Sequence, residues 1–228
     1  MKKHCKSLLL ATAGLVLGLA GAGPGYAATV YDLTSCHLSG GCGTATQFGT
    51  VSLTQSGTSV LFDVVLNSGN LFVETGAGGN SLFVFNDTVA GSTVTNITAT
   101  FNGATVNIAG GLTGLTNQSP IMADGTGTFT AQIFCTTASS CNGASGIDVN
   151  DLHFTVTNAT IAQLTTANAQ GNIFVADILC GQTGCTGLTG PVDVSTPPRT
   201  VPEPASMLLL GSGLAGIGLW NMKRRKSA

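Results

Sequence analysis

Alternation of apolar and polar residues between positions 47 and 66 is the feature that most limits how this chain can fold. Gln47–Thr54 alternates first, and Gln55–Thr58 then supplies a short turn that contains a glycine. After the turn, every second residue is apolar: Val60, Phe62, Val64 and Leu66. A period of two places these side chains on one face of a strand and Asp63 on the other. Two such runs around a short turn predict a β-hairpin.

The rest of the chain between residues 28 and 190 repeats this pattern in short segments. Thr and Val, which suit half-buried strands, recur throughout it, and Gly and Asn mark the turns. Further strands are predicted at 71–74, 81–85, 94–101, 105–108, 127–134, 151–157, 160–164 and 172–179. This number of short strands, separated by frequent turns, is typical of a β-sandwich or jelly roll. We therefore predict one all-β body at 28–190.

The N-terminus reads as a secretory signal peptide at residues 1–27. Lys2, Lys3 and Lys6 form a positive region, and an apolar run from Leu8 to Ala22 follows it. Small residues before Ala28 provide a cleavage site. The chain is therefore expected to be exported through the inner membrane.

The C-terminus combines three features in a fixed order. A Pro-rich linker is predicted at 191–200, and Pro202, Glu203 and Pro204 follow it. The stretch from 205 to 222 carries no charge and would span about 27 Å as a helix, close to the thickness of a bilayer core. The basic cluster comes last and comprises Lys223, Arg224, Arg225 and Lys226. The length of the uncharged stretch predicts a single transmembrane helix, and the charge of the basic cluster predicts that this cluster lies on the cytoplasmic side.

This ending, from Val201 to Lys226, resembles the PEP-CTERM sorting signal of Gram-negative bacteria. The resemblance implies that an exosortase recognises the tail, that the protein is anchored in the membrane before processing, and that cleavage occurs near Pro202-Glu203-Pro204. It also implies a final location at the cell surface or outside the cell. The stretch from Phe48 to Asn86 is similar to the body of many PEP-CTERM proteins of unassigned function. A plain C-terminal anchor is the alternative.

Charge is distributed very unevenly along the chain. No Lys or Arg occurs between residues 28 and 198. The acids of this segment are Asp32, Asp63, Glu74, Asp87, Asp124, Asp148, Asp151, Asp177 and Asp193. Nucleic acid is excluded as a partner because phosphate binding requires cationic side chains. Cations remain candidates, and like-charge repulsion favours solubility.

Six cysteines remain after Cys5 is removed with the signal peptide. They form three close pairs along the chain: Cys36 and Cys42, Cys135 and Cys141, and Cys180 and Cys185. Cysteines of an exported protein are expected to form disulfides, and three local pairs are the most economical scheme. A metal site at Cys36, His37 and Cys42 is the alternative. A redox role would favour a Cys-x-x-Cys motif, which is absent.

Few residues of the body carry a recognisable chemistry. Asp148, Asn150 and Asp151 offer oxygen donors for a weak calcium site, although ordinary turn formation also explains them. His37 and His153 match no catalytic motif, so we expect no catalytic residue and no enzyme. We predict a structural or interaction role at the cell surface or in the extracellular matrix, with extracellular polysaccharide as a candidate partner. The alternatives are a calcium- or glycan-binding module and, third, a glycan-acting enzyme that uses paired carboxylates.

Overall fold

The computed structural model describes residues 27–67, 69–75, 81–141, 147–194 and 199–201. Ala28–Val201 forms one compact unit built from β-strands, so the prediction of an all-β body is confirmed. Residues 1–26 of the predicted signal peptide lie outside the described residues, and so do the triplet, the predicted transmembrane helix and the basic cluster. Among the described residues, no helix has the length and hydrophobicity needed to cross a membrane.

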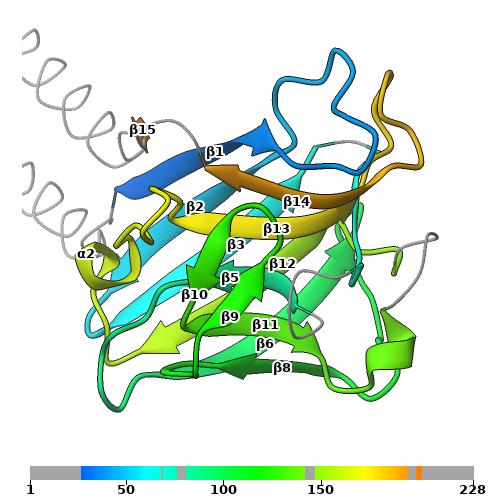
Figure 1. The fold of residues 1–228 in the computed structure, drawn as a ribbon. Helices are drawn as coiled ribbons and strands as arrows, with labels where there is room; N and C mark the ends of the chain where they lie inside the picture. The colour runs from blue at the N-terminus through cyan, green and yellow to red at the C-terminus, as the bar shows by residue number, and fades with distance from the viewer. Residues whose placement is uncertain (1–26, 68, 76–80, 142–146, 195–198, 202–228) are drawn as a thin grey trace, which may run out of the picture. The chain divides into compact units, whose positions relative to one another are not determined.

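Thirteen of the strands form one sheet (Figure 1), and all of its pairings are antiparallel. The order along the sheet is β7-β6-β12-β3-β2-β1-β14-β13-β5-β11-β8, with β15 paired to β1 and β4 paired to β13. The strands are β1 (Ala28–Cys36), β2 (Gly49–Ser56), β3 (Ser59–Leu66), β4 (Leu71–Phe72), β5 (Ser81–Phe85), β6 (Thr93–Phe101), β7 (Ala104–Thr105), β8 (Leu112–Leu115), β11 (Ala131–Cys135), β12 (Asp151–Thr157), β13 (Phe174–Leu179), β14 (Thr189–Val194) and β15 (Arg199–Val201). A separate hairpin consists of β9 (Ile121–Ala123) and β10 (Gly127–Phe129).

The sheet is curled and continuous, whereas a sandwich or jelly roll would contain two separate sheets. β1 makes the sheet continuous because it pairs with β2 on one side and with β14 on the other. The register between β1 and β14 shifts between Leu33 and Ser35, and such irregularities bend a strand. The sheet curls until β6, near one end, contacts β8 at the other. A Cβ atom at Gly114 of β8 would clash with Val94 of β6, so a glycine permits this approach.

Phenylalanine rings fill the space enclosed by the curled sheet. Phe62 of β3 stacks on Phe154 of β12, with the ring centroids 4.5 Å apart. It also meets rings from the opposite part of the sheet, with centroids 5.2 Å from Phe85 and 5.9 Å from Phe174. These four rings are buried. The alternation at Val60–Leu66 therefore identified the inward face of β3 correctly.

The β9–β10 hairpin buries a second, smaller apolar cluster. Its members are Val84, Ile121, Ala123, Phe129 and Val175. In Figure 1 the hairpin lies in front of β5 and β13. Both faces of β5 are consequently covered, which explains why all five of its residues are buried.

The predicted strand at 160–164 is wrong, because Ile161–Leu164 forms the short helix α2. The Gln163 side chain accepts a hydrogen bond from the backbone N–H of Thr160, and Gln55 accepts one from the N–H of Ile161. These bonds satisfy N–H groups that the start of a helix leaves without a partner. Leu164 is buried, whereas the residues between Ile161 and Leu164 are exposed.

The Pro-rich segment also differs from its expected role as a linker over 191–200. Pro191 and the three residues after it belong to β14, and they are buried. The Pro191 carbonyl accepts a hydrogen bond from the N–H of His37, so proline fits here without providing a donor. Arg199–Val201 then forms β15 against the start of β1, which places Val201 opposite Ala28.

Both ends of the body therefore lie at the same end of the sheet, at the start of β1. Cys36, at the far end of the same nine-residue strand, pairs with Val192. A strand of this length extends about 26 Å at the usual rise per residue. The loops that follow β1 and precede β14 leave the sheet at this opposite end (Figure 1).

Candidate functional site

Three disulfides occur in the body: Cys36–Cys42, Cys135–Cys141 and Cys180–Cys185. These are the three local pairs expected from the sequence. Each bond closes a loop that begins where a strand ends: β1, β11 or β13. We call the region formed by these loops and the segment 67–75 the disulfide end.

Hydrogen bonds join the loops of the disulfide end to one another. The Gln182 side chain donates to the Gln47 carbonyl at 2.9 Å, which connects the loops after β13 and β1. The N–H of Gly181 donates to the side chain of Asn70, and the N–H of Glu74 donates to the Cys141 carbonyl at 2.9 Å. Asn70 and Glu74 thereby link the segment 67–75 to two of the disulfide loops, and Gln182 connects one of these to the chain that follows the Cys36–Cys42 loop.

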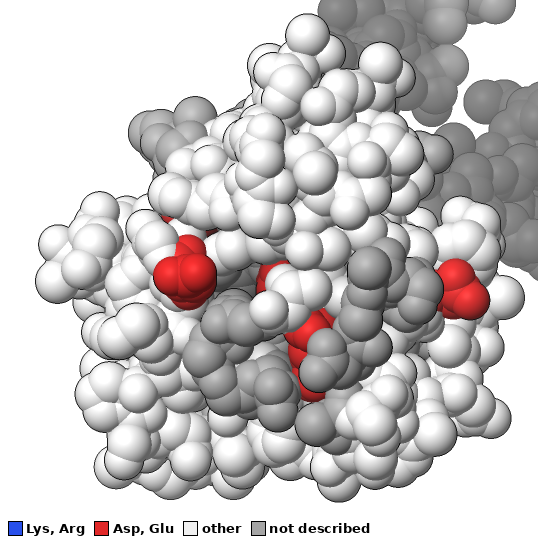
Figure 2. Space-filling model, turned by 45° about the vertical axis from the view of Figure 1, so that its right-hand side comes forward, with Lys and Arg blue, Asp and Glu red and all other residues white. Residues whose placement is uncertain are grey.

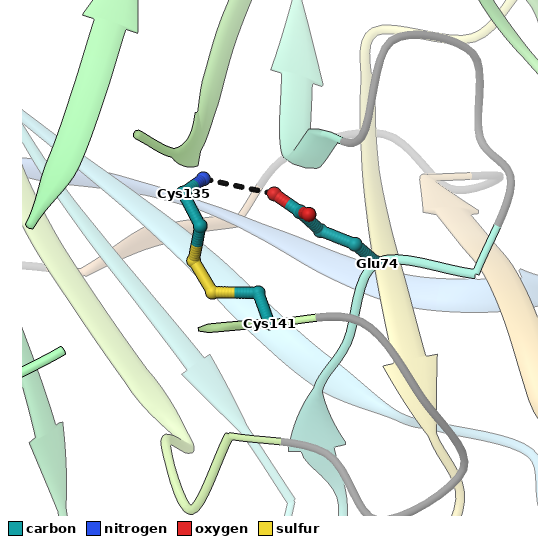
Figure 3. Close-up of side chains that lie close together, drawn as sticks. All are labelled: Glu74, Cys135 and Cys141. Carbon is teal, nitrogen blue, oxygen red and sulfur yellow. Dashed lines mark hydrogen bonds between the residues drawn. A yellow bond between two sulfur atoms is a disulfide. The ribbon is translucent and has the colours of Figure 1, made fainter. Parts of the chain in front are cut away.

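Glu74 lies beside the Cys135–Cys141 disulfide, as Figure 3 shows. Its Oε1 accepts a hydrogen bond of 2.8 Å from the backbone N–H of Cys135. Its Oε2 is buried and has no hydrogen-bond partner among the described residues. One carboxylate oxygen of Glu74 and the Sγ atoms of both cysteines lie within 4.8 Å of one another, and all three residues are buried. They are the one group of this kind in the described part of the chain.

Burial makes the Glu74 carboxyl a weaker acid than usual. Glu74 is only 2% exposed, and desolvation raises its pKa to about 7. The hydrogen bond from the Cys135 backbone lowers this pKa, and the nearby negative charge of Asp177 raises it. Asp177 is itself buried and accepts hydrogen bonds from the backbone and hydroxyl of Thr75. Two carboxyls thus share a region that holds no Lys or Arg side chain. Such a carboxyl can exchange a proton near neutral pH or bind a cation.

The outer face of β3 and β12 carries a second candidate, a groove of about 430 Å³. Asp63 and His153 face each other across the two strands in direct register. The Nδ1 atom of His153 lies 3.1 Å from Oδ1 of Asp63. Partial burial raises the pKa of Asp63, which His153 lowers and Asp151 raises further. Around this pair the groove is lined by small polar and apolar side chains, among them Ser52, Thr54, Leu61, Asn96 and Thr155.

The stretch of chain that holds the acids, residues 28–198, contains no Lys or Arg. In Figure 2, carboxylate surface appears at several places on one face, partly in a hollow, and no Lys or Arg is visible. Among the described residues, a histidine contacts the buried carboxyl of Asp193. His37 Nε2 lies 3.0 Å from Oδ2 of Asp193, whose side chain is 2% exposed. This contact occupies the imidazole that the alternative metal site at Cys36 and Cys42 would require.

The residues of the predicted calcium site are divided between different surroundings. Asp148 is exposed and has a left-handed backbone with a φ of 46°. Asn150 Oδ1 accepts from the N–H of Asn102, and Asp151 Oδ2 accepts from Thr100. Two of the three side chains therefore already bind β6 or the turn after it, and the calcium site stays a prediction.

Sequence reasoning did not identify Glu74 or the Asp63–His153 pair as a site. Glu74 follows the apolar run Leu71–Val73 directly, and an acid at such a position is the available signal that it is buried. Asp63 was correctly placed on the face of β3 opposite the buried apolar residues, and His153 lies on the same outer face in the neighbouring strand β12. Their pairing depends on the register between β3 and β12, which distant segments of sequence do not reveal.

Comparison with protein families matches residues 200–225 to the PEP-CTERM protein-sorting motif. The predicted sorting signal is therefore confirmed, and its position begins inside β15 and continues beyond the described residues. The motif implies that the protein is exported, processed by an exosortase and sorted to the surface. The three disulfides agree with a location outside the cytoplasm. Comparison with curated proteins and with solved structures finds no match to this chain.

Proposed function

We propose that this protein is a structural or interaction component of the cell surface or extracellular matrix, and not an enzyme. The sorting motif at 200–225 carries the proposal, because it begins within the last described strand of a disulfide-bonded body. The signal peptide delivers the body across the inner membrane, and the predicted helix at 205–222 holds it there. Exosortase then acts at Pro202-Glu203-Pro204.

The position of the chain ends favours the disulfide end as the interacting surface. Ala28 and Val201 lie side by side, so the tether leaves the end of the sheet that is remote from the disulfide end. The distance along β1 is about 26 Å. Short disulfide loops fix the shape of an exposed surface before a partner arrives, which lowers the entropic cost of binding.

The charge of the body favours uncharged or cation-bridged partners over anionic ones. Residues 28–198 contain acids but no Lys or Arg. An anionic polymer would be repelled unless a divalent cation lies between the two. We therefore favour neutral polysaccharide, or polysaccharide bound through a cation, as the partner.

Expression of the protein in two strains of one host, with and without exosortase, tests the proposed processing. With exosortase, we expect the body in the surface and extracellular fractions, without the tail. In the strain that lacks exosortase, we expect the membrane fraction to hold the chain with residues 205–226 still attached. Equal distribution and equal mass in the two strains would refute processing by exosortase and leave a plain anchor.

A glycan- or calcium-binding module is the second candidate, and the groove at Asp63 and His153 favours it. Carboxylate and imidazole groups bordered by Ser, Thr and Asn side chains can form hydrogen bonds to sugar hydroxyls. The exported protein would be passed over polysaccharide purified from the host, with and without calcium. Asp63→Asn should reduce retention, whereas Asp124→Asn, an equal charge change at an exposed residue of the β9–β10 hairpin, should not. Equal retention of the two variants would count against the groove.

Glycan cleavage remains the third candidate. It would require two carboxyls at a suitable spacing around a sugar. Release of soluble sugar by the wild type, abolished in Asp63→Asn, would favour an enzyme over a binding module.

A further inference from the structure

We propose that Cys135 and Cys141, when reduced, form a binding site for Zn²⁺ together with Glu74. The disulfide and the metal site would be alternative states of the same three residues. Reduction would permit metal binding, and oxidation would abolish it. The site lies at the disulfide end, apart from the groove at Asp63 and His153.

The positions of the donor atoms carry this proposal. An oxygen of Glu74 and the two Sγ atoms already lie within 4.8 Å of one another (Figure 3). The N–H of Cys135 holds Oε1 of Glu74 at 2.8 Å and so orients the carboxylate. Oε2 has no hydrogen-bond partner among the described residues, although it is buried. A metal ligand whose other atom is fixed by a hydrogen bond is a common arrangement in protein sites.

The environment of Glu74 leaves its charge without compensation. Glu74 is 2% exposed, and residues 28–198 contain no Lys or Arg that could pair with it. The neighbouring acid, Asp177, adds negative charge, and the Thr75 backbone and hydroxyl donate hydrogen bonds to it. A buried carboxylate in such a place is costly unless a cation binds it. A divalent cation would supply this compensation.

The chemistry of the donors selects the metal. Two thiolates and one carboxylate suit zinc, which takes sulfur, nitrogen and oxygen ligands in tetrahedral sites. Calcium and magnesium prefer oxygen ligands and would gain little from the sulfurs. Three protein ligands leave the fourth position of a tetrahedral site for water or another small ligand.

Reduction of the disulfide requires a dithiol reductant, which we include in the proposal. The dithiol transfers two electrons and two protons to the sulfurs of Cys135 and Cys141, and it becomes a disulfide itself. Zn²⁺ then displaces the two thiol protons, together with the proton of Glu74 in the molecules that carry one. A disulfide oxidant reverses the change: it accepts two electrons from the two thiolates and two protons from water and becomes a dithiol, while the Cys135–Cys141 bond re-forms and Zn²⁺ is released.

The other disulfides provide matched controls within the same chain. Cys36–Cys42 and Cys180–Cys185 also close short local loops. Among the described residues, neither pair lies close to a carboxylate or histidine that would complete a group of three metal ligands. They should therefore bind zinc more weakly after reduction, although they contain the same number of thiols.

Zinc titration of three variants, each retaining one cysteine pair and carrying serine at the other four positions, tests the proposal. After reduction by a dithiol and removal of the reductant, the variant with Cys135 and Cys141 should bind one equivalent of Zn²⁺. We expect at least about tenfold tighter binding than in either other variant, since even residues that only support a metal ligand contribute this much. Comparable affinity in all three variants would overturn the proposal. Stoichiometric zinc binding to the oxidised wild type would also overturn it.

Glu74→Gln separates the role of the carboxylate from simple thiol binding. In the variant that retains Cys135 and Cys141, this substitution should weaken zinc binding at least about tenfold. Co²⁺ should give the visible absorption of a tetrahedral thiolate site in the parent, and the spectrum should change in Glu74→Gln. If the serine variants do not fold, as judged by circular dichroism, the same titration uses the six-cysteine protein. Mass mapping of alkylated cysteines then identifies which thiols zinc protects, and protection of any pair other than Cys135 and Cys141 would refute the proposal.

Discussion

Phe62→Ala should be among the most destabilising substitutions in this protein. Phe62 is 2% exposed and contacts Phe154 in the neighbouring strand as well as Phe85 and Phe174 across the core. Truncation of a buried phenylalanine typically costs 3–5 kcal/mol, including the cavity that it leaves. We expect about 4 kcal/mol, because Phe62 joins parts of the curled sheet that are not neighbours in strand order.

Urea unfolding of the exported protein with its disulfides intact would measure this loss. With an m-value of about 2 kcal/mol/M, a loss of 4 kcal/mol lowers the unfolding midpoint by about 2 M. The control is Leu61→Ala in the next position of the same strand, because Leu61 is 44% exposed. Its effect should stay within about 0.5 kcal/mol. A loss below about 1.5 kcal/mol for Phe62→Ala, or equal losses in both variants, would refute the packing described here.

A double-mutant cycle would show whether the two parts of the sheet meet through these rings. Phe62 and Phe174 should show a coupling energy of about 0.5–1.5 kcal/mol, since their rings form an edge-to-face pair. Phe129 belongs to the separate cluster under the β9–β10 hairpin, so its truncation should be additive with that of Phe62. Additivity of the Phe62 and Phe174 substitutions would mean that the sheet is less curled than described.

Three further predictions concern the carboxyl, the disulfides and the tail. Because burial raises the pKa of Glu74 from 4.5 to about 7, the stability that it gives in the protonated form should be lost as the pH rises from about 4.5 to 7; Glu74→Gln should remove this part of the pH dependence of unfolding, and an unchanged dependence would contradict the burial. Replacing Cys180 and Cys185 by serine should cost about 2 kcal/mol in urea unfolding, because the closed loop is short, and non-reducing peptide mapping of the wild type should show no long-range link. Glu203→Ala should leave membrane insertion intact but block processing, so intact mass in an exosortase host should show a chain longer by about the length of the tail; normal trimming of this variant would show that processing does not depend on Glu203.

The sequence predicted the inward face of β3 but not how the strands assemble. The alternation of Val60 and Phe62 identified the core side of β3, and the run Ser81–Phe85 is a buried strand as expected. Pattern is informative here because β3 buries every second residue and β5 buries all of its residues. β1 was not predicted, since the burial along it is irregular and its middle bends where the register shifts.

The other wrong or missed predictions depend on particular hydrogen bonds and contacts, which the pattern of residue types does not reveal. Pro191 suggested a linker, but its carbonyl accepts the hydrogen bond that β14 needs there. The segment 160–164 looked like a strand because its residues other than Gln163 are β-branched or apolar, yet the Gln163 and Gln55 side chains favour a helical turn. Glu74 could not be recognised as a buried carboxyl near a disulfide because three separate segments create its surroundings.

The position of β1 within the sheet bears on the order of events during export. β1 is the first strand to leave the signal peptide, yet its partner β14 is close to the last, with Leu33 opposite Val194. Loop closure over such a separation makes folding slow, whereas each disulfide joins cysteines only five or six positions apart. The loops can therefore oxidise while the chain is still crossing the membrane, but the sheet can close only once the residues up to 194 have crossed. We therefore expect the complete sheet to form only when export is nearly finished, next to the segment that matches the sorting motif.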